Sequence, residues 1–174
     1  MREKNGLQTV IRYLSDGIVL IALAWLVVYC FLSQVTISGH SMEPRLSSGN
    51  LVLVDTLRYK LLPPRRMDIV AFRRSDNTEN VKRVIGLPGE IVVIQSGHIY
   101  IDGVLLDRPE ISDIALPGIA QNPVELSEDE YFLIGDNTDS SEDSRFENVG
   151  NVRRSQIYGR LWLRVLPLSR LELL

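Results

Sequence analysis

Residues 18–44 set the organisation of the chain and read IVLIALAWLVVYCFLSQVTISGHSMEP. The first part, Ile18–Leu32, is apolar and uncharged, and it ends shortly before the segment Ser38–Pro44. Glycine and proline punctuate that segment and would hold Ser41 in a turn. A serine held in a turn beside an apolar anchor is a candidate nucleophile at a membrane surface.

The apolar run has the properties of a membrane anchor. A span needs roughly 17–25 residues, and the flanking Gly17 and residues 33–37 carry no charge, so a span of about 20 residues fits. A buried core helix usually carries a polar stripe, which this run lacks. A cleaved signal peptide needs a small-x-small site after its apolar core, and residues 30–35 provide no convincing one.

Basic residues predict the orientation of the anchor. Arg2, Lys4 and Arg12 flank its N-terminal side, which the positive-inside rule assigns to the cytoplasm. We therefore expect residues 1–35 to form a cytoplasmic N-terminus and a single transmembrane helix, and residues 36–174 to form an extracytoplasmic domain.

After Ile37 the sequence changes to short runs rich in β-branched residues, separated by turn residues. Ser96-Gly97 and Asp102-Gly103 lie between such runs and are hairpin signals. Residues 107–127 contain three prolines and little periodicity, so we expect an exposed excursion there. The predicted fold is mainly β, with strands near residues 51–54, 68–72, 81–85, 91–94, 98–101, 104–106, 131–134 and 159–165.

Composition argues against several classes of function. The 174 residues suffice for one domain with a core. The formal charge of −3 gives no basic footprint for nucleic acid. The single cysteine, Cys30, cannot form an intramolecular disulfide, and two histidines without a Cys/His cluster argue against a zinc site.

Serine becomes a good nucleophile only when a base takes its proton. His40 is adjacent to Ser41, but neighbouring side chains on extended backbone point to opposite faces. Lys82 lies between Val81 and Val84, and burial among apolar side chains would lower the pKa of its amine. A solvated strand lysine is the commoner alternative, and the residues alone favour it.

Two further blocks follow Ser38–Pro44, namely KRVIGLPGE at Lys82–Glu90 and GDNTDSSEDSR at Gly135–Arg145. In this order the three blocks resemble the type I signal peptidases, which are membrane-bound Ser/Lys proteases that remove signal peptides. The resemblance extends from the anchor nearly to the C-terminus and implies a β-rich catalytic domain of the signal-peptidase type. It also implies that Ser41 is the nucleophile and that Lys82 is the general base.

The third block supplies the supporting residues that the resemblance implies. Ser141 would orient the Lys82 amine by a hydrogen bond, Asp143 and Arg145 would form an ion pair behind it, and Asp136 would brace the loop. The Ser41 backbone N–H is one expected donor to the oxyanion. Some relatives use a serine hydroxyl two residues before the nucleophile as a second donor, but that position is Gly39 here.

The resemblance also implies a substrate groove and the absence of any metal or organic cofactor. An extended peptide would add to the sheet edge, with shallow apolar pockets for small side chains. The positions that resemble pocket-lining ones are Ile37, Met42, Ala71 and Val81, and ordinary β core is the alternative for each.

Three residues depart from the family's usual pattern. Met67 replaces a glycine, which removes backbone freedom there, Thr138 stands where arginine is usual, and Asp139 stands where asparagine is common. None of these departures removes a predicted catalytic group.

The sequence therefore predicts a membrane-anchored serine endopeptidase that cleaves signal peptides of exported preproteins after small-x-small motifs. Its expected partners are those peptides, the lipid bilayer and the secretion translocon, and its expected location is the plasma membrane or a thylakoid membrane. Two alternative functions would require different features. A self-cleaving repressor-type Ser/Lys protease would carry a DNA-binding N-terminus in place of the anchor. An inactive, membrane-tethered peptide-binding module would not need Ser41, Lys82 and Ser141 together.

Overall fold

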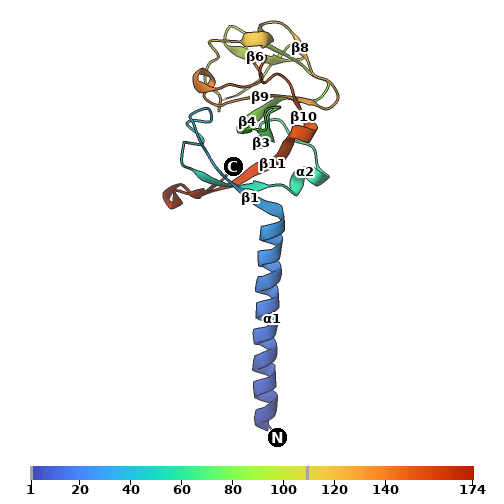
Figure 1. Cartoon of the computed structure of the whole chain (residues 1–174), viewed down its shortest axis with the longest axis vertical. Helices are drawn as coiled ribbons and strands as arrows, with labels where there is room; N and C mark the ends of the chain where they lie inside the picture. Colours follow the sequence, from blue (N-terminus) through green and yellow to red (C-terminus); the bar gives the residue numbers. More distant parts are fainter. Residues whose placement is uncertain (1, 109) are drawn as a thin grey trace.

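Helix α1, Arg2–Phe31, stands away from the rest of the chain as a single rod (Figure 1). The computed structural model describes residues 2–108 and 110–174, and within the first 36 residues it describes the side chains at positions 6, 8–26 and 33–36. Within α1, the 19-residue segment Gln8–Leu26 has a mean hydropathy of 1.6, and none of it is buried. Among the described helices it alone is long and apolar enough to cross a membrane.

The apolar segment of α1 begins earlier than the sequence predicted, because Gln8–Ser15 continue the helix with few charged residues. The predicted run also included residues 27–32, and the predicted orientation relied on Arg2 and Lys4. The side chains of those residues lie outside the described ones.

A large antiparallel sheet of eight strands begins directly after α1. Seven strands follow the spatial order β1-β2-β11-β3-β4-β9-β10, and β12 pairs with β11. The strands are β1 Leu32–Thr36, β2 Leu51–Asp55, β3 Ile69–Arg73, β4 Glu79–Gly86, β9 Glu130–Ile134, β10 Val152–Arg153, β11 Ile157–Leu166 and β12 Glu172–Leu173. The sheet thus begins at Leu32, inside the segment that the sequence assigned to the anchor.

A second antiparallel sheet forms the end of the molecule farthest from α1 (Figure 1). Its order is β7-β6-β5-β8. The predicted hairpin is present, because β5 and β6 are joined by Ser96 and Gly97 with φ angles of 50° and 80°. Positive φ at both central residues matches the twist of the flanking strands. The strands are β5 Ile91–Gln95, β6 His98–Ile101, β7 Val104–Leu105 and β8 Val124–Glu125.

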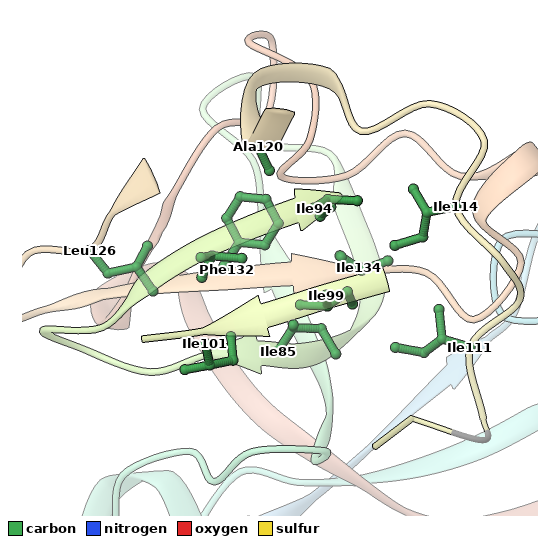
Figure 2. Close-up of a cluster of buried hydrophobic side chains, with 11 residues drawn as sticks. Ile85, Ile94, Ile99, Ile101, Ile111, Ile114, Ala120, Leu126, Phe132 and Ile134 are labelled. Atoms are coloured by element: carbon green, nitrogen blue, oxygen red, sulfur yellow. The ribbon is translucent and has the colours of Figure 1, made fainter. Parts of the chain in front are cut away.

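The segment 107–127 differs from the predicted exposed excursion, because it contributes side chains to the core. Its apolar residues pack with side chains from β4, β5, β6 and β9 in one buried cluster (Figure 2). They are irregularly spaced, so they follow no strand or helix period and were missed in the sequence. The buried members from this segment are Ile111, Ile114, Ala120 and Leu126.

A second buried cluster holds the serine segment against the large sheet. Met42 and Leu46, which follow Ser41, are almost completely buried among strand residues. The backbone N–H of Leu46 also donates to the Met42 carbonyl at 2.7 Å. Because its following residues are fixed in the core, Ser41 is held in place. The strand members of the cluster include Val52, Val54, Ile69, Ala71 and Leu161. The predicted mainly β fold class with an N-terminal apolar helix is confirmed.

Candidate active site

Ser41 and Lys82 come from distant parts of the chain and meet at the surface of the large sheet. Gly39, with a φ of 84°, turns the chain after β1, and Ser41 follows in that turn. Lys82 lies on β4, where its Cα partner on β3 is Val70. The Lys82 Nζ is 2.9 Å from the Ser41 Oγ. The two residues are therefore within direct proton-transfer distance.

Burial changes the acid–base properties of Lys82. Its side chain is only 3% exposed, and this desolvation lowers the pKa of its amine from 10.5 to about 8. A substantial fraction of the amine is therefore neutral at mildly alkaline pH. A neutral amine has a lone pair that can accept the Ser41 proton, which an ammonium group lacks.

The histidine next to Ser41 is turned away from it. His40 is exposed, and its Nδ1 lies 3.1 Å from a Glu43 carboxylate oxygen. Glu43, rather than Ser41, is therefore the partner of the imidazole.

The loop that follows β9 lies directly against the serine segment. The Asn137 N–H donates to the Ser41 carbonyl at 3.0 Å. A Cβ added at Gly135 would lie 2.5 Å from that same carbonyl oxygen and would also overlap the Ser141 side chain. Because a backbone oxygen cannot move aside easily, a glycine at position 135 permits this close approach.

Asp143 and Arg145 form a buried ion pair within this loop. The Arg145 Nε is 2.8 Å from Asp143, and the guanidinium also donates to the carbonyls of Leu116, Thr138 and Ser141. Both side chains are almost completely inaccessible to solvent. Arg145 therefore links several backbone segments around the carboxylate.

Asp136 braces the strand of the base as well as its own loop. Its carboxylate accepts two hydrogen bonds from Arg83, at 2.7 and 2.6 Å. Arg83 follows Lys82 on β4, so their side chains leave opposite faces of the strand. Arg83 was not predicted from the sequence, although a charged residue inside an apolar strand is itself a signal that a partner of opposite charge is needed.

Ser141 lies in this loop without the expected hydrogen bond to Lys82. Its side chain is buried, and its Oγ has no hydrogen-bond partner among the described residues. The Lys82 amine donates a hydrogen bond to the Ser41 Oγ instead. The structure thus holds a buried hydroxyl with free hydrogen-bonding capacity in the loop that contacts the Ser41 backbone.

A narrow groove of about 80 Å³ opens onto Ser41 and Lys82. Residues 35–38 form one side, residues 79–82 form the other, and Met42 and Tyr158 complete it. Three of the predicted pocket residues, Ile37, Met42 and Val81, line this groove. Ala71 does not, because it is fully buried in the cluster beneath.

Both sides of the groove offer strand edges. In the first half of β4, residues 79–82 pair with β3, whereas pairing with β9 starts only at Arg83. Among the strands of the described residues, β1 pairs with β2 alone. The edge of each strand that faces away from its partner can therefore hydrogen-bond an extended peptide. The sequence did not predict that Tyr158, on β11, and Glu79, on β4, would line the same groove. Their strands are not neighbours in the sheet, because β3 lies between them.

A larger cavity of about 550 Å³ is lined by residues such as Pro44, Arg45 and Asp136 but by neither Ser41 nor Lys82. The smaller groove is therefore the one that matches the reactive pair. Among the described residues, no group of three or more His, Cys, Asp or Glu side chains could hold a metal ion.

The structure shows how two of the residues that depart from the family's usual pattern, Met67 and Thr138, are accommodated. Met67 adopts a φ of 70°, a left-handed conformation that glycine takes more readily. The backbone shape is thus kept, and its N–H donates to the Val84 carbonyl at 2.8 Å. Thr138 bonds to Ser112 and to the Asp113 carbonyl, at 2.9 and 2.7 Å, and so ties the segment 107–127 to the loop.

Comparison with known proteins places this arrangement in a family. The family model for "Signal peptidase, peptidase S26" matches residues 10–166, which is most of the chain. The chain belongs to the signal peptidase family. The match includes Ser41, Lys82 and the whole loop after β9, and membership in the signal peptidase family indicates a serine endopeptidase.

Individual signal peptidases agree with the family match. The chain is 35% identical over 145 residues to a probable signal peptidase I-2 of Synechocystis sp., covering 79% of this chain and 65% of that protein's length. It is 35% identical over 150 residues to a signal peptidase I of Bacillus caldolyticus, with 79% and 81% covered. A signal peptidase IB of Staphylococcus aureus is 28% identical over 183 residues, with 92% and 94% covered.

A solved structure is also similar to part of the chain. It is a signal peptidase I from Enterococcus faecalis V583, with 31% sequence identity and a TM-score of 0.47. The similarity covers 57% of this chain and 97% of that one.

Proposed function

We propose that the chain is a membrane-anchored serine endopeptidase that removes signal peptides from exported preproteins, with Ser41 as nucleophile and Lys82 as general base. The observation that carries the proposal is the 2.9 Å contact between the Lys82 Nζ and the Ser41 Oγ, made by a buried lysine. Family membership supports the reaction class, and the geometry supports the assignment of the two roles.

The first half of the reaction needs only these two side chains and one backbone group. The neutral Lys82 amine takes the Ser41 proton while the Oγ attacks the scissile carbonyl carbon. Negative charge develops on the carbonyl oxygen, and the Ser41 N–H, which has no acceptor among the described contacts, is available to donate to it. The Lys82 ammonium then gives its proton to the leaving amine as the C–N bond breaks.

The second half regenerates the enzyme. The signal peptide remains as an ester on Ser41, and the amine of Lys82 is neutral again. Lys82 can then take a proton from water as that water attacks the ester carbonyl. Collapse of the second oxyanion breaks the bond to the Oγ, which recovers its proton from Lys82.

The shape of the groove supports a substrate with small side chains. A peptide in extended form could pair with the free edges at residues 35–38 and 79–82, and alternate side chains would then point into the groove. A volume of about 80 Å³ suits side chains no larger than a few heavy atoms. This supports cleavage after small-x-small motifs, with Ile37, Met42 and Val81 contacting the small residues.

The base assignment predicts a pH dependence. Because Lys82 must be neutral to accept a proton, kcat/KM is expected to rise tenfold per pH unit below its pKa of about 8 and to level off above it. The measurement is cleavage of a signal-peptide substrate between pH 6 and pH 10. A profile that stays flat down to pH 6 would contradict a lysine base.

The position of α1 supports attachment of the β-rich part to the bilayer surface. In Figure 1, α2, Arg58–Leu61, and the C-terminal segment lie at the end of the β-rich part from which α1 leaves. Exposed leucines occur in both places, and Leu61 and Leu168 are 74% and 73% exposed. Leucines at this end could enter the bilayer interface beside the anchor. Further exposed leucines in these two segments are Leu62, Leu166, Leu171 and Leu173.

The basic flank of α1 predicts the topology in the plasma membrane or a thylakoid membrane. With Arg2 and Lys4 before the apolar segment and Arg12 near its N-terminal end, the positive-inside rule puts that end in the cytoplasm, and the β-rich part would lie outside. Protease added to right-side-out vesicles is expected to reach residues 32–174. Protection of that part until the vesicles are lysed would show the opposite orientation.

A further inference from the structure

Glu142 links the loop after β9 to another part of the site. It lies between Ser141 and Asp143, yet its own side chain points to the surface. Its Oε2 accepts a hydrogen bond from the Arg74 Nη1 at 2.5 Å, and Arg74 also donates to the Asn148 carbonyl at 3.3 Å. The Asn148 side-chain amide donates to the other Glu142 oxygen. Arg74, Glu142 and Asn148 thus form a closed network, which we call the rim network.

Arg74 belongs to a well-fixed turn that leads into the strand of Lys82. The Arg74 N–H donates to the Thr78 carbonyl at 2.9 Å, and the Asn77 N–H donates to the Arg74 carbonyl at 3.0 Å. Asp76 accepts hydrogen bonds from both the N–H and the hydroxyl of Thr78. The Arg74 side chain is only 16% exposed. The rim network therefore joins two structured segments, the β3–β4 turn and the Ser141 loop.

Charges around Lys82 divide into an inner and an outer pair. The inner pair, Asp143 and Arg145, is buried and closes on itself. The outer pair is Arg74 and Glu142, whose charges act on the Lys82 amine in opposite directions: Arg74 lowers its pKa and Glu142 raises it. Other nearby charged groups are already paired, as Arg83 with Asp136, Glu79 with Arg73, and His40 with Glu43.

We propose that Arg74 and Glu142 are positioning residues for the Lys82 base, which hold the Ser141 loop against the turn before β4 and balance the charge that the amine experiences. The proposal rests on the proposed function of Lys82. It assigns a role to two residues that are not among those lining the groove.

The test uses the full-length enzyme in detergent and the pH profile of kcat/KM. The acidic limb is the low-pH part of this profile, where kcat/KM rises as Lys82 loses its proton. Arg74→Gln leaves Glu142 without its cationic partner and is expected to move the acidic limb to higher pH by about 0.3–0.5 pH units. Glu142→Gln leaves Arg74 without its anionic partner and is expected to move the acidic limb to lower pH by about the same amount. Arg74→Lys and the double variant Arg74→Gln/Glu142→Gln should both return the limb close to its wild-type position. Added salt should shrink both shifts.

Opposite shifts would support the proposal, because loss of a merely structural link would act in the same direction in both single variants. Two unshifted limbs, or two limbs that move together, would overturn it even if activity falls. The failure of the proposed function itself would be visible separately, as a wild-type profile without an acidic limb or as activity that survives Lys82→Met.

Discussion

Lys82→Met is expected to reduce kcat on the order of 10⁴-fold while leaving the protein folded. Methionine fills a similar volume in a site that is only 3% exposed, but it cannot accept the Ser41 proton. Lys82→Arg should fail as well, because a guanidinium does not deprotonate near neutral pH. Single-turnover cleavage of a signal-peptide substrate measures the effect.

Lys60→Met is the matched control for this loss. Lys60 is an exposed lysine on α2 and lies outside the groove. Its replacement is expected to leave kcat in detergent within about twofold, since surface changes away from the site have small effects. Comparable activity of the Lys82→Met enzyme and the wild type would remove Lys82 from the mechanism.

Asp136→Asn is expected to lower the free energy of unfolding by about 3–5 kcal/mol, because it leaves the buried Arg83 charge without a counter-charge. Asp136 is fully buried and Arg83 is 5% exposed. For a chain of this size the loss corresponds to a decrease in Tm on the order of 10 °C. Thermal unfolding of the full-length protein in detergent, followed by circular dichroism of the β-rich part, measures it.

Arg73→Gln provides the control for the buried pair. It breaks the Arg73–Glu79 ion pair, whose side chains are 60% and 48% exposed. An exposed pair contributes little, so the expected loss is at most about 1 kcal/mol. If Asp136→Asn cost no more than Arg73→Gln, the Arg83–Asp136 pair would not stabilise the site as its geometry indicates.

Local sequence signals identified the elements of the fold better than their arrangement. Ser96-Gly97 predicted its hairpin because a two-residue turn depends on those residues alone. The uncharged run after Gly17 likewise indicated an apolar helix. The order β1-β2-β11-β3-β4 could not be predicted, because the C-terminal strand inserts between two early strands through contacts far apart in the sequence. The segment 107–127 was misjudged because tertiary packing, rather than periodicity, buries its isoleucines.

For the site, the resemblance to signal peptidases identified Lys82 as the base, which its neighbouring residues alone could not do. Valines beside Lys82 were compatible with a buried base, but only the structure brings its amine to Ser41. Ala71 was placed in the pocket by alignment, and its pairing with Val81 puts it on the groove's face of the sheet, but its side chain is completely buried in the cluster below the groove. Arg83–Asp136 and Arg74–Glu142 join residues 53 and 68 positions apart. No sequence spacing could indicate these two pairs.

The most direct test of the Ser41/Lys82 assignment is the cleavage of one exported preprotein by the purified full-length enzyme and by Ser41→Ala, followed by intact mass measurement of the products. If Ser41 is the nucleophile, the wild type should make one cut, after a small-x-small motif, and Ser41→Ala should make no cut at the same enzyme concentration. A cut at that position by Ser41→Ala at the wild-type rate would contradict the assignment, as would an intact preprotein after incubation with the wild type at pH 9.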